Sequence, residues 1–104
     1  MAGNNGSTFS TQAINVPTVQ TAATALAANT GRIAWSIQNQ GTNVLYVLLG
    51  TGASTSVYHY TLKACSVAAD GTGGSLAMEM GTVYNGIITV AGTSPSYTVA
   101  DIST

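Results

Sequence analysis

The chain's single histidine, His59, is the residue best suited to acid–base chemistry, because an imidazole titrates near neutral pH. A catalytic histidine usually works beside a carboxylate that orients it or a nucleophile that it activates. The only carboxylates are Asp70, Glu79 and Asp101, and none stands at a recognisable spacing from His59. The sequence therefore favours a surface or interface histidine, and we predict that the protein is not an enzyme.

Two other features could in principle hold a metal ion or a phosphate. Cys65 is the single cysteine, which excludes an internal disulfide and a cysteine-based zinc site, and the dispersed carboxylates form no oxygen-ligand cluster. The stretch DGTGGS at 70–75 has the glycines of a phosphate loop but lacks its lysine and does not lead from a strand into a helix. We expect a turn there, a small buried residue at Cys65, and neither a metal nor a cofactor.

Charged residues make up only 5% of the 104 residues, whereas an average soluble domain has roughly a quarter. Two basic residues, Arg32 and Lys63, are too few to bind the phosphates of a nucleic acid or an anionic membrane, so both are excluded as partners. Arg32 is expected to have a structural role, pairing with Asp101 or Asp70 or capping carbonyl groups. The net charge of −1 leaves little repulsion between copies, which favours a protein that sits against other protein.

Short β-strands must position these residues, because apolar and polar residues alternate over most of the chain. Turns rich in Gly, Asn, Ser and Thr separate predicted strands at 14–19, 32–38, 44–49, 57–64, 76–80, 84–91 and 96–102. About seven or eight short strands at this spacing predict an all-β fold, either an antiparallel β-sandwich or a jelly-roll-like barrel.

Four details of this scheme can be tested in the structure. Pro17 places the first strand at a sheet edge, and the Ala-rich tract at 21–31 is predicted to be an extended crossing segment with room for one helical turn. The nearly all-apolar 44–49 predicts a strand buried on both faces. The stretch GTSPS at 92–96 predicts a hairpin between the last two strands.

The sequence predicts one β domain at 13–104 behind a flexible N-terminal arm at 1–12, in which Phe9 is the one aromatic residue. The arm could become ordered by lying along a neighbouring subunit. It lacks the basic start and apolar run of a signal peptide, and no stretch approaches the ~18 apolar residues of a membrane span. Synthesis in a bacterial-type cytoplasm is therefore expected.

The aromatic residues divide between core and interface. Trp35 shares a predicted strand face with Ile33 and Ile37 and is interpreted as core, in preference to a platform for stacking on sugars. Tyr58 and Tyr60 share one face of the predicted 57–64 strand, and both core and interface are open to them, since tyrosine is favoured at protein interfaces.

The segments ALAANTGRIAWSIQNQGTN and LYVLLGTGAST, followed by DGTGGS and GIITVAGTSPSYTV, carry a resemblance that covers residues 22 to 102. The chain resembles small virion proteins of tailed bacteriophages, in particular the capsid decoration (cement) proteins of marine phages. The resemblance implies an all-β domain that associates, often as trimers, over gaps between major capsid proteins. It brings no catalytic residues.

The predicted function is a structural decoration protein on the outer capsid surface of the virion, bound to the major capsid protein and to copies of itself as a homotrimer. The charge-free turns on either side of the 44–49 strand add two residues to the predicted interface, which consists of Phe9, Asn43, Thr51, Tyr58 and Tyr60. The alternative is a tail or head-fibre adhesin domain that recognises a host-surface glycan through Trp35 or exposed tyrosines.

Overall fold

Two antiparallel four-stranded sheets make up the computed structural model, which describes residues 13–14, 19–78 and 83–103. All regular structure in these residues is β, so the predicted all-β sandwich is confirmed. The strands are β2 (Ala13–Ile14), β3 (Thr24–Leu26), β4 (Arg32–Asn39), β5 (Leu45–Leu49), β6 (Tyr60–Leu62), β7 (Ser75–Met78), β8 (Ile88–Ala91) and β9 (Tyr97–Ser103).

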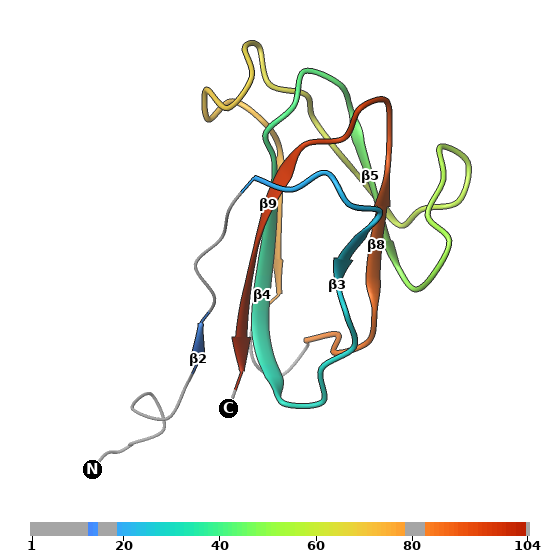
Figure 1. The fold of residues 1–104 in the computed structure, drawn as a ribbon, viewed down its shortest axis with the longest axis vertical. Coiled ribbons are helices and arrows are strands. Elements are labelled where there is room, and N and C mark those ends of the chain that lie inside the picture. Colours follow the sequence, from blue (N-terminus) through green and yellow to red (C-terminus); the bar gives the residue numbers. More distant parts are fainter. Residues whose placement is uncertain (1–12, 15–18, 79–82, 104) are drawn as a thin grey trace.

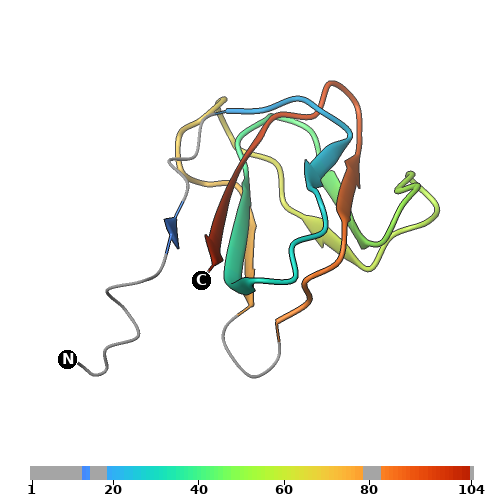
Figure 2. The ribbon, with the colours of Figure 1, turned by 60° about the horizontal axis from the view of Figure 1, so that its bottom comes forward.

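The strand pairing is nested, as in a long hairpin that has been rolled up. β5 pairs with β6, β4 with β7, β3 with β8 and β2 with β9. Two further pairings, β4 with β9 and β5 with β8, close the roll into sheets of order β2-β9-β4-β7 and β3-β8-β5-β6. This arrangement is a jelly roll, and its two sheets lie as separate layers (Figures 1 and 2).

The core lies between the layers and follows the period-two pattern of the sequence. In β4, Trp35 and Ile37 are buried against the other sheet, while Ser36 and Gln38 alternate outward. Tyr97 is fully buried, and its hydroxyl donates to the Ala22 carbonyl at 2.6 Å, so the tract before β3 is tied to β9. The buried cluster consists of Ala25, Trp35, Ile37, Leu45, Val47, Leu62, Ile88, Val90, Tyr97 and Val99.

The predicted hairpin at 92–96 is wrong, because this turn carries the chain from one sheet to the other. β8 lies between β3 and β5, whereas β9 lies between β2 and β4 in the opposite layer. A turn signal such as Gly92 with Pro95 specifies a change of direction, but the partner of each strand is decided by long-range burial.

Several predicted boundaries also change. The 57–64 strand shrinks to β6 and the 84–91 strand to β8, and the tract at 21–31 contains β3 in place of the possible helical turn. β2 lies at a sheet edge, as predicted, although Pro17 itself lies outside the described residues, as do Glu79 and Met80 of the predicted 76–80 strand.

Candidate functional site

The loop at 50–59 is fastened to the outer side of the β3-β8-β5-β6 sheet, and it forms the candidate interaction surface. Thr89, on β8, donates through Oγ1 to the Gly50 carbonyl at 2.7 Å and accepts from the Ala53 N–H at 3.2 Å. At the far end of the loop, His59 Nδ1 accepts from the Leu49 N–H at 3.0 Å. His59 is thus exposed, as expected, but it has a definite structural contact with the strand that it follows.

This loop explains why β5 lacks polar alternation. Leu45 and Val47 face the core, and Leu48, on the other side of the strand, is also buried. Leu48 lies opposite Thr89 in the register, at the place where the loop is fastened. β5 is therefore covered on both faces, as predicted, and the outer cover is a segment of the same chain.

An aromatic ridge, consisting of Val57 and Tyr58, projects from this loop. These two residues are 51% and 43% exposed, and Tyr60 of β6, on the other face of the sheet, is 37% exposed. The Tyr58 ring packs on Tyr46 of β5, with ring centroids 4.9 Å apart. Ser54 holds the loop closed by accepting the Val57 N–H on its hydroxyl at 3.0 Å. The ridge therefore presents large apolar side chains on a backbone that is already ordered.

The other predicted interface residues are dispersed. Tyr58 and Tyr60 do not share a strand face. Tyr60 lies opposite Val47 and on the same face of β6 as the core-facing Leu62, whereas Tyr58 packs on Tyr46, on the outer side of the sheet. Thr51 is exposed in the same loop, and Asn43 is exposed in the 40–44 turn, where its Nδ2 donates to the Thr93 carbonyl at 3.1 Å. Phe9 lies outside the described residues.

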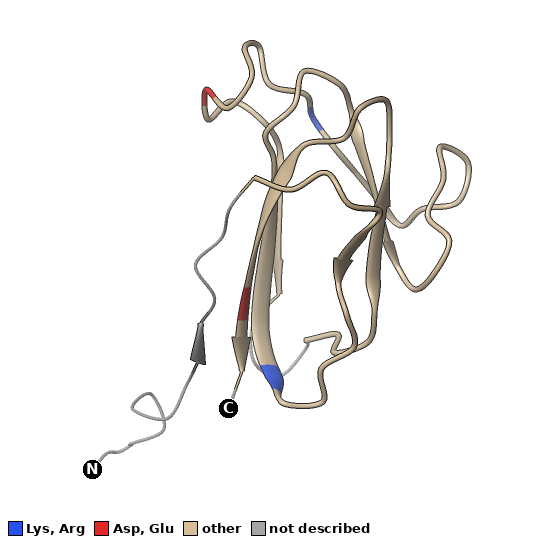
Figure 3. Ribbon diagram, in the orientation of Figure 1, with Lys and Arg blue, Asp and Glu red and all other residues tan. Residues whose placement is uncertain are grey.

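Arg32 closes one end of the sandwich. Its side chain is 0% exposed, and its Nε donates to Asp101 Oδ1 at 3.0 Å, one of the two carboxylates considered from the sequence; the pair is coloured blue and red at the same end of β4 and β9 in Figure 3. Its other nitrogens donate to the carbonyls of Ala27 at 2.7 Å, Gly86 at 2.9 Å and Tyr84 at 3.3 Å. One guanidinium therefore joins both sheets through four acceptors.

The inward position of Arg32 departs from strict alternation. The sequence pattern placed Arg32 on the face opposite Trp35, but the register with β9 shifts between Arg32 and Ala34. This bulge adds one residue, so Arg32 turns to the core side and reaches Asp101, which lies opposite Trp35.

Asn39 closes the other end of β4, a role that the residue pattern does not predict. It is buried, and its Nδ2 donates to the carbonyls of Asn43 at 2.8 Å and of Leu62 and Lys63 at 3.2 Å each. Its Oδ1 accepts from the Gly41 N–H at 2.9 Å. An asparagine at a strand end before Gly is a turn signal, and only the fold shows that its side chain also binds the opposite sheet.

The glycine-rich loop at 65–74 is a turn, ordered by Asp70. Asp70 Oδ1 accepts from the Thr72 N–H at 2.9 Å and the Thr72 hydroxyl at 2.6 Å, and Oδ2 accepts from the Val67 N–H at 2.9 Å. Gly73 is required where the loop meets β4, since a Cβ there would overlap the Asn39 carbonyl oxygen and approach Cys65 Sγ to 2.8 Å. Both carboxylate oxygens of Asp70 therefore bond within their own loop.

The Asp70 carboxylate is expected to hold this loop down to low pH. The Thr72 hydroxyl, and then the Thr72 N–H, lower the pKa of Asp70 below its ordinary value of 3.8. A lowered pKa in the folded state means that the contribution of Asp70 is present above pH 3.8 and is lost as the pH falls through the lower value. The Thr72 amide resonance should therefore titrate below pH 3.8 and should lose this titration in Asp70→Asn; a midpoint at or above 3.8 would contradict the geometry.

The remaining candidates for chemistry are held inside the structure. Trp35 is 2% exposed, so it presents no platform to a sugar. Cys65 is buried and donates through Sγ to the Asn39 carbonyl at 3.3 Å. Within the described residues no group of three metal-ligating side chains occurs, and no helix is long and apolar enough to cross a bilayer.

Comparisons with family models, curated proteins and solved structures give no match to this chain. The fold and the surface therefore carry the functional argument. The aromatic ridge is the strongest observation: Tyr58 could be picked out in the sequence, but the loop that fixes it could not.

Proposed function

We propose that the protein is a structural capsid decoration protein that binds the outer surface of a bacteriophage head as a homotrimer and stabilises it. The observation that carries this proposal is the aromatic ridge, an exposed and ordered apolar surface on a chain with few charges. Such a surface suits contact with another protein, since tyrosine offers a large contact area at a small cost in side-chain entropy.

The electrostatics of the surface support repeated packing against protein. In the described part of the chain, the exposed charged residues are Lys63 and Asp70, and the net charge of the whole chain is −1. Neighbouring copies therefore repel one another little, and each contact can be individually weak when many copies bind one lattice. Binding should persist at high salt, because screening acts mainly on exposed charges.

The fold and the position of Trp35 bear on the alternative function. Jelly rolls occur among viral capsid domains and among lectins, so the architecture is compatible with both a decoration protein and an adhesin. Because Trp35 is buried, a glycan-binding function would depend on the exposed tyrosines alone. The aromatic ridge is the surface that both functions would use, and an experiment must separate them.

Removing the apolar side chains of the ridge is expected to weaken binding to phage heads. Tyr58→Ala and Val57→Ser should each reduce affinity about tenfold or more, the effect of losing an interface anchor. The measurement is co-sedimentation of recombinant protein with heads that lack it, at low and high salt. Val67→Ser is the matched control, because Val67 is also an exposed valine, 66% accessible, but lies in the 65–74 loop.

Immunogold labelling of particles from the source sample decides between the two functions. Gold over the head, together with the loss of binding in Tyr58→Ala, would support decoration. Gold confined to the tail would replace it with the adhesin. If the ridge variants bound heads as tightly as the unmodified protein does, the ridge would not be the capsid contact.

A further inference from the structure

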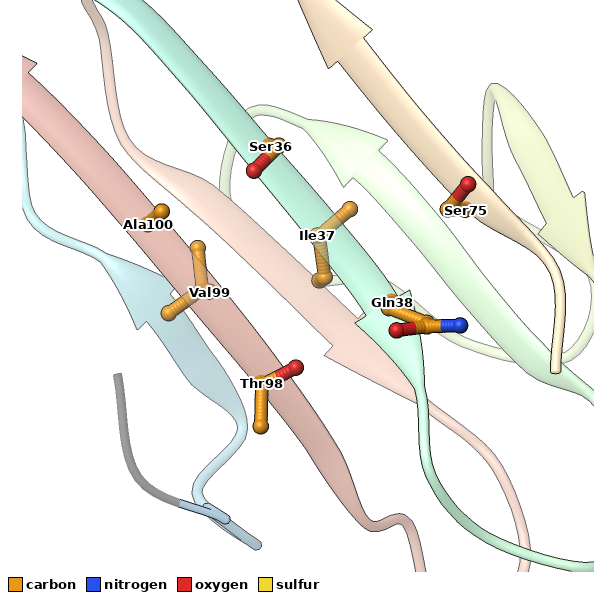
Figure 4. Close-up of a pocket in the computed structure, with 7 residues that line it drawn as sticks. All are labelled: Ser36, Ile37, Gln38, Ser75, Thr98, Val99 and Ala100. Atoms are coloured by element: carbon orange, nitrogen blue, oxygen red, sulfur yellow. The ribbon is translucent and has the colours of Figure 1, made fainter. Parts of the chain in front are cut away.

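The outer face of the β2-β9-β4-β7 sheet, on the opposite side of the sandwich from the ridge, is hollowed. Two adjoining hollows of about 250 Å³ and 190 Å³ lie over β9, β4 and β7 and share Ser36 and Ala100. Figure 4 shows the larger one, with Ser36 and Gln38 on β4, Thr98 and Ala100 on the neighbouring β9, and Ser75 on β7. We refer to both hollows together as the sheet hollow.

The sheet hollow is neutral and graded in polarity. Its smaller part is lined by Ala34, Ala77, Ala100 and Ile102, and its larger part includes the polar side chains of Gln38 and Thr98, with none of the lining residues charged. The outward side chains of this sheet are small and leave the hollow open, whereas the outer face of the other sheet is covered by the 50–59 loop. A sheet face of this kind is suited to a covering layer of extended chain.

The position of β2 indicates which chain covers it. β2 is the edge strand of this sheet, and Ile14 pairs with Ile102, a residue of the sheet hollow. Residues 1–12, which lie outside the described part of the chain, directly precede β2. β2 starts at Ala13, opposite Ser103 at the end of β9, and runs antiparallel to β9, so a segment that precedes Ala13 would have to reverse its direction to reach its own hollow.

We propose that the sheet hollow receives residues 1–12 of a second copy of this chain, with Phe9 in the part lined by Ala34, Ala77, Ala100 and Ile102. Phe9 is the only aromatic residue of that segment, and the Ser, Thr and Asn residues around it can bond to Gln38 and Thr98. Twelve residues span at most roughly 40 Å, enough to leave one sheet and cross another. The proposal rests on the proposed function only in that it names the contact between copies.

If each copy places its N-terminal segment in the sheet hollow of the next copy, the copies can form a closed ring. Each copy donates one segment and receives one, so the contact joins two different surfaces. A contact of this kind closes into a ring when the rotation between copies allows it, and a ring of three fills every sheet hollow. One such contact is small, and the two made by each copy bring the buried area closer to that of a stable interface.

The test is the mass of the full chain in solution, measured by light scattering or sedimentation over about 1 to 100 µM, the range of micromolar dissociation constants. We expect an oligomer whose dissociation constant rises about tenfold or more in Phe9→Ser and in Ala100→Leu, which fills the shared part of the sheet hollow. Thr8→Ser and Ala68→Leu are the matched controls, the second at an exposed alanine outside the hollow. The double variant Phe9→Ser/Ala100→Leu should have a dissociation constant no higher than that of the single variants, because both substitutions remove the same contact.

Each result supports or overturns the proposal. A chain that stays monomeric at the highest concentration overturns it, as does either variant that associates like the unmodified protein. Phe9→Ser keeps the test valid even where Ala100→Leu lowers stability, since Phe9 precedes the β domain. An unmodified protein that binds heads but does not self-associate would overturn this proposal alone, whereas an unmodified protein that self-associates but does not bind heads would overturn the decoration function alone.

Discussion

Replacing Arg32 with methionine is expected to lower the free energy of unfolding by about 3–5 kcal/mol, the cost of breaking a buried ion pair from one side. The change leaves the Asp101 carboxylate, which is 19% exposed, without its guanidinium. It also leaves the carbonyls of Ala27, Tyr84 and Gly86 without their Arg32 donors at the end of the sandwich. Domains of this kind are stable by about 5–15 kcal/mol, so the change removes about a fifth of the total or more.

Two further variants, measured beside Arg32→Met, separate the charge of Arg32 from its geometry. Arg32→Lys keeps the charge but offers one nitrogen in place of three, so it should recover only part of the loss. Lys63→Met removes an exposed cation of the same charge and should change stability by no more than about 0.5 kcal/mol. Urea denaturation at pH 7 measures all three. If Arg32→Met cost no more than Lys63→Met, the guanidinium would not be holding the two sheets together.

The core residues and the edge position of β2 could be predicted from the sequence, but the way in which the chain crosses between the two sheets could not. Alternation placed Trp35 and Ile37 inside, and the unbroken apolar run of β5 predicted burial on both faces. Both signals are local, because they depend on which way successive side chains point. The 92–96 turn was misjudged because its residues specify a reversal, whereas its sheet-to-sheet crossing depends on which strands bury β8 and β9.

The polar contacts were less visible in the sequence, for a physical reason. Arg32 could be expected to pair with a carboxylate because so few charges exist, but the bulge that turns it inward leaves no mark in the residue pattern. Asn39 looks like any turn asparagine. The loop that carries Tyr58 looked like part of a strand, since the bonds that hold it as a loop form only in the folded chain. The Leu49 N–H donates to His59 Nδ1, and the Ala53 N–H donates to Thr89 on β8.

Arg32 and Asn39 form two polar junctions, one at each end of β4. Together they explain how the two sheets stay together in a domain with so few charges. β4 is the longest of the strands that the structure describes, and it pairs on both sides, with β9 and β7. Arg32 at its start and Asn39 at its end each bond to segments that belong to the other sheet. A sandwich is open at its ends, where backbone carbonyls would otherwise lack partners, so a donor with several N–H groups at each end satisfies them without a network of surface charges.

Asn39→Ala is therefore expected to lower the free energy of unfolding by about 2–4 kcal/mol, because three buried or half-buried carbonyls each lose a donor and the Gly41 N–H loses its acceptor at once. Asn43→Ala is the matched control. Asn43 is exposed, and its side chain makes one bond, to the Thr93 carbonyl, so the cost there should stay below about 1 kcal/mol. Equal losses in both variants would mean that burial of Asn39 adds nothing to its hydrogen bonds.

Asn39→Asp tests the same junction without changing its shape. The introduced carboxylate would face the carbonyl oxygens of Asn43, Leu62 and Lys63, so its folded-state pKa should rise above the ordinary value. A raised pKa means that the folded state holds the proton more tightly than the unfolded state, and the variant should lose stability relative to the unmodified protein as the pH rises from about 4 to 7. A deficit independent of pH would show that the site admits water or relaxes, and the buried junction inferred from the geometry would then be wrong. A deficit that grows with pH would establish that Asn39 is retained at this position as a donor.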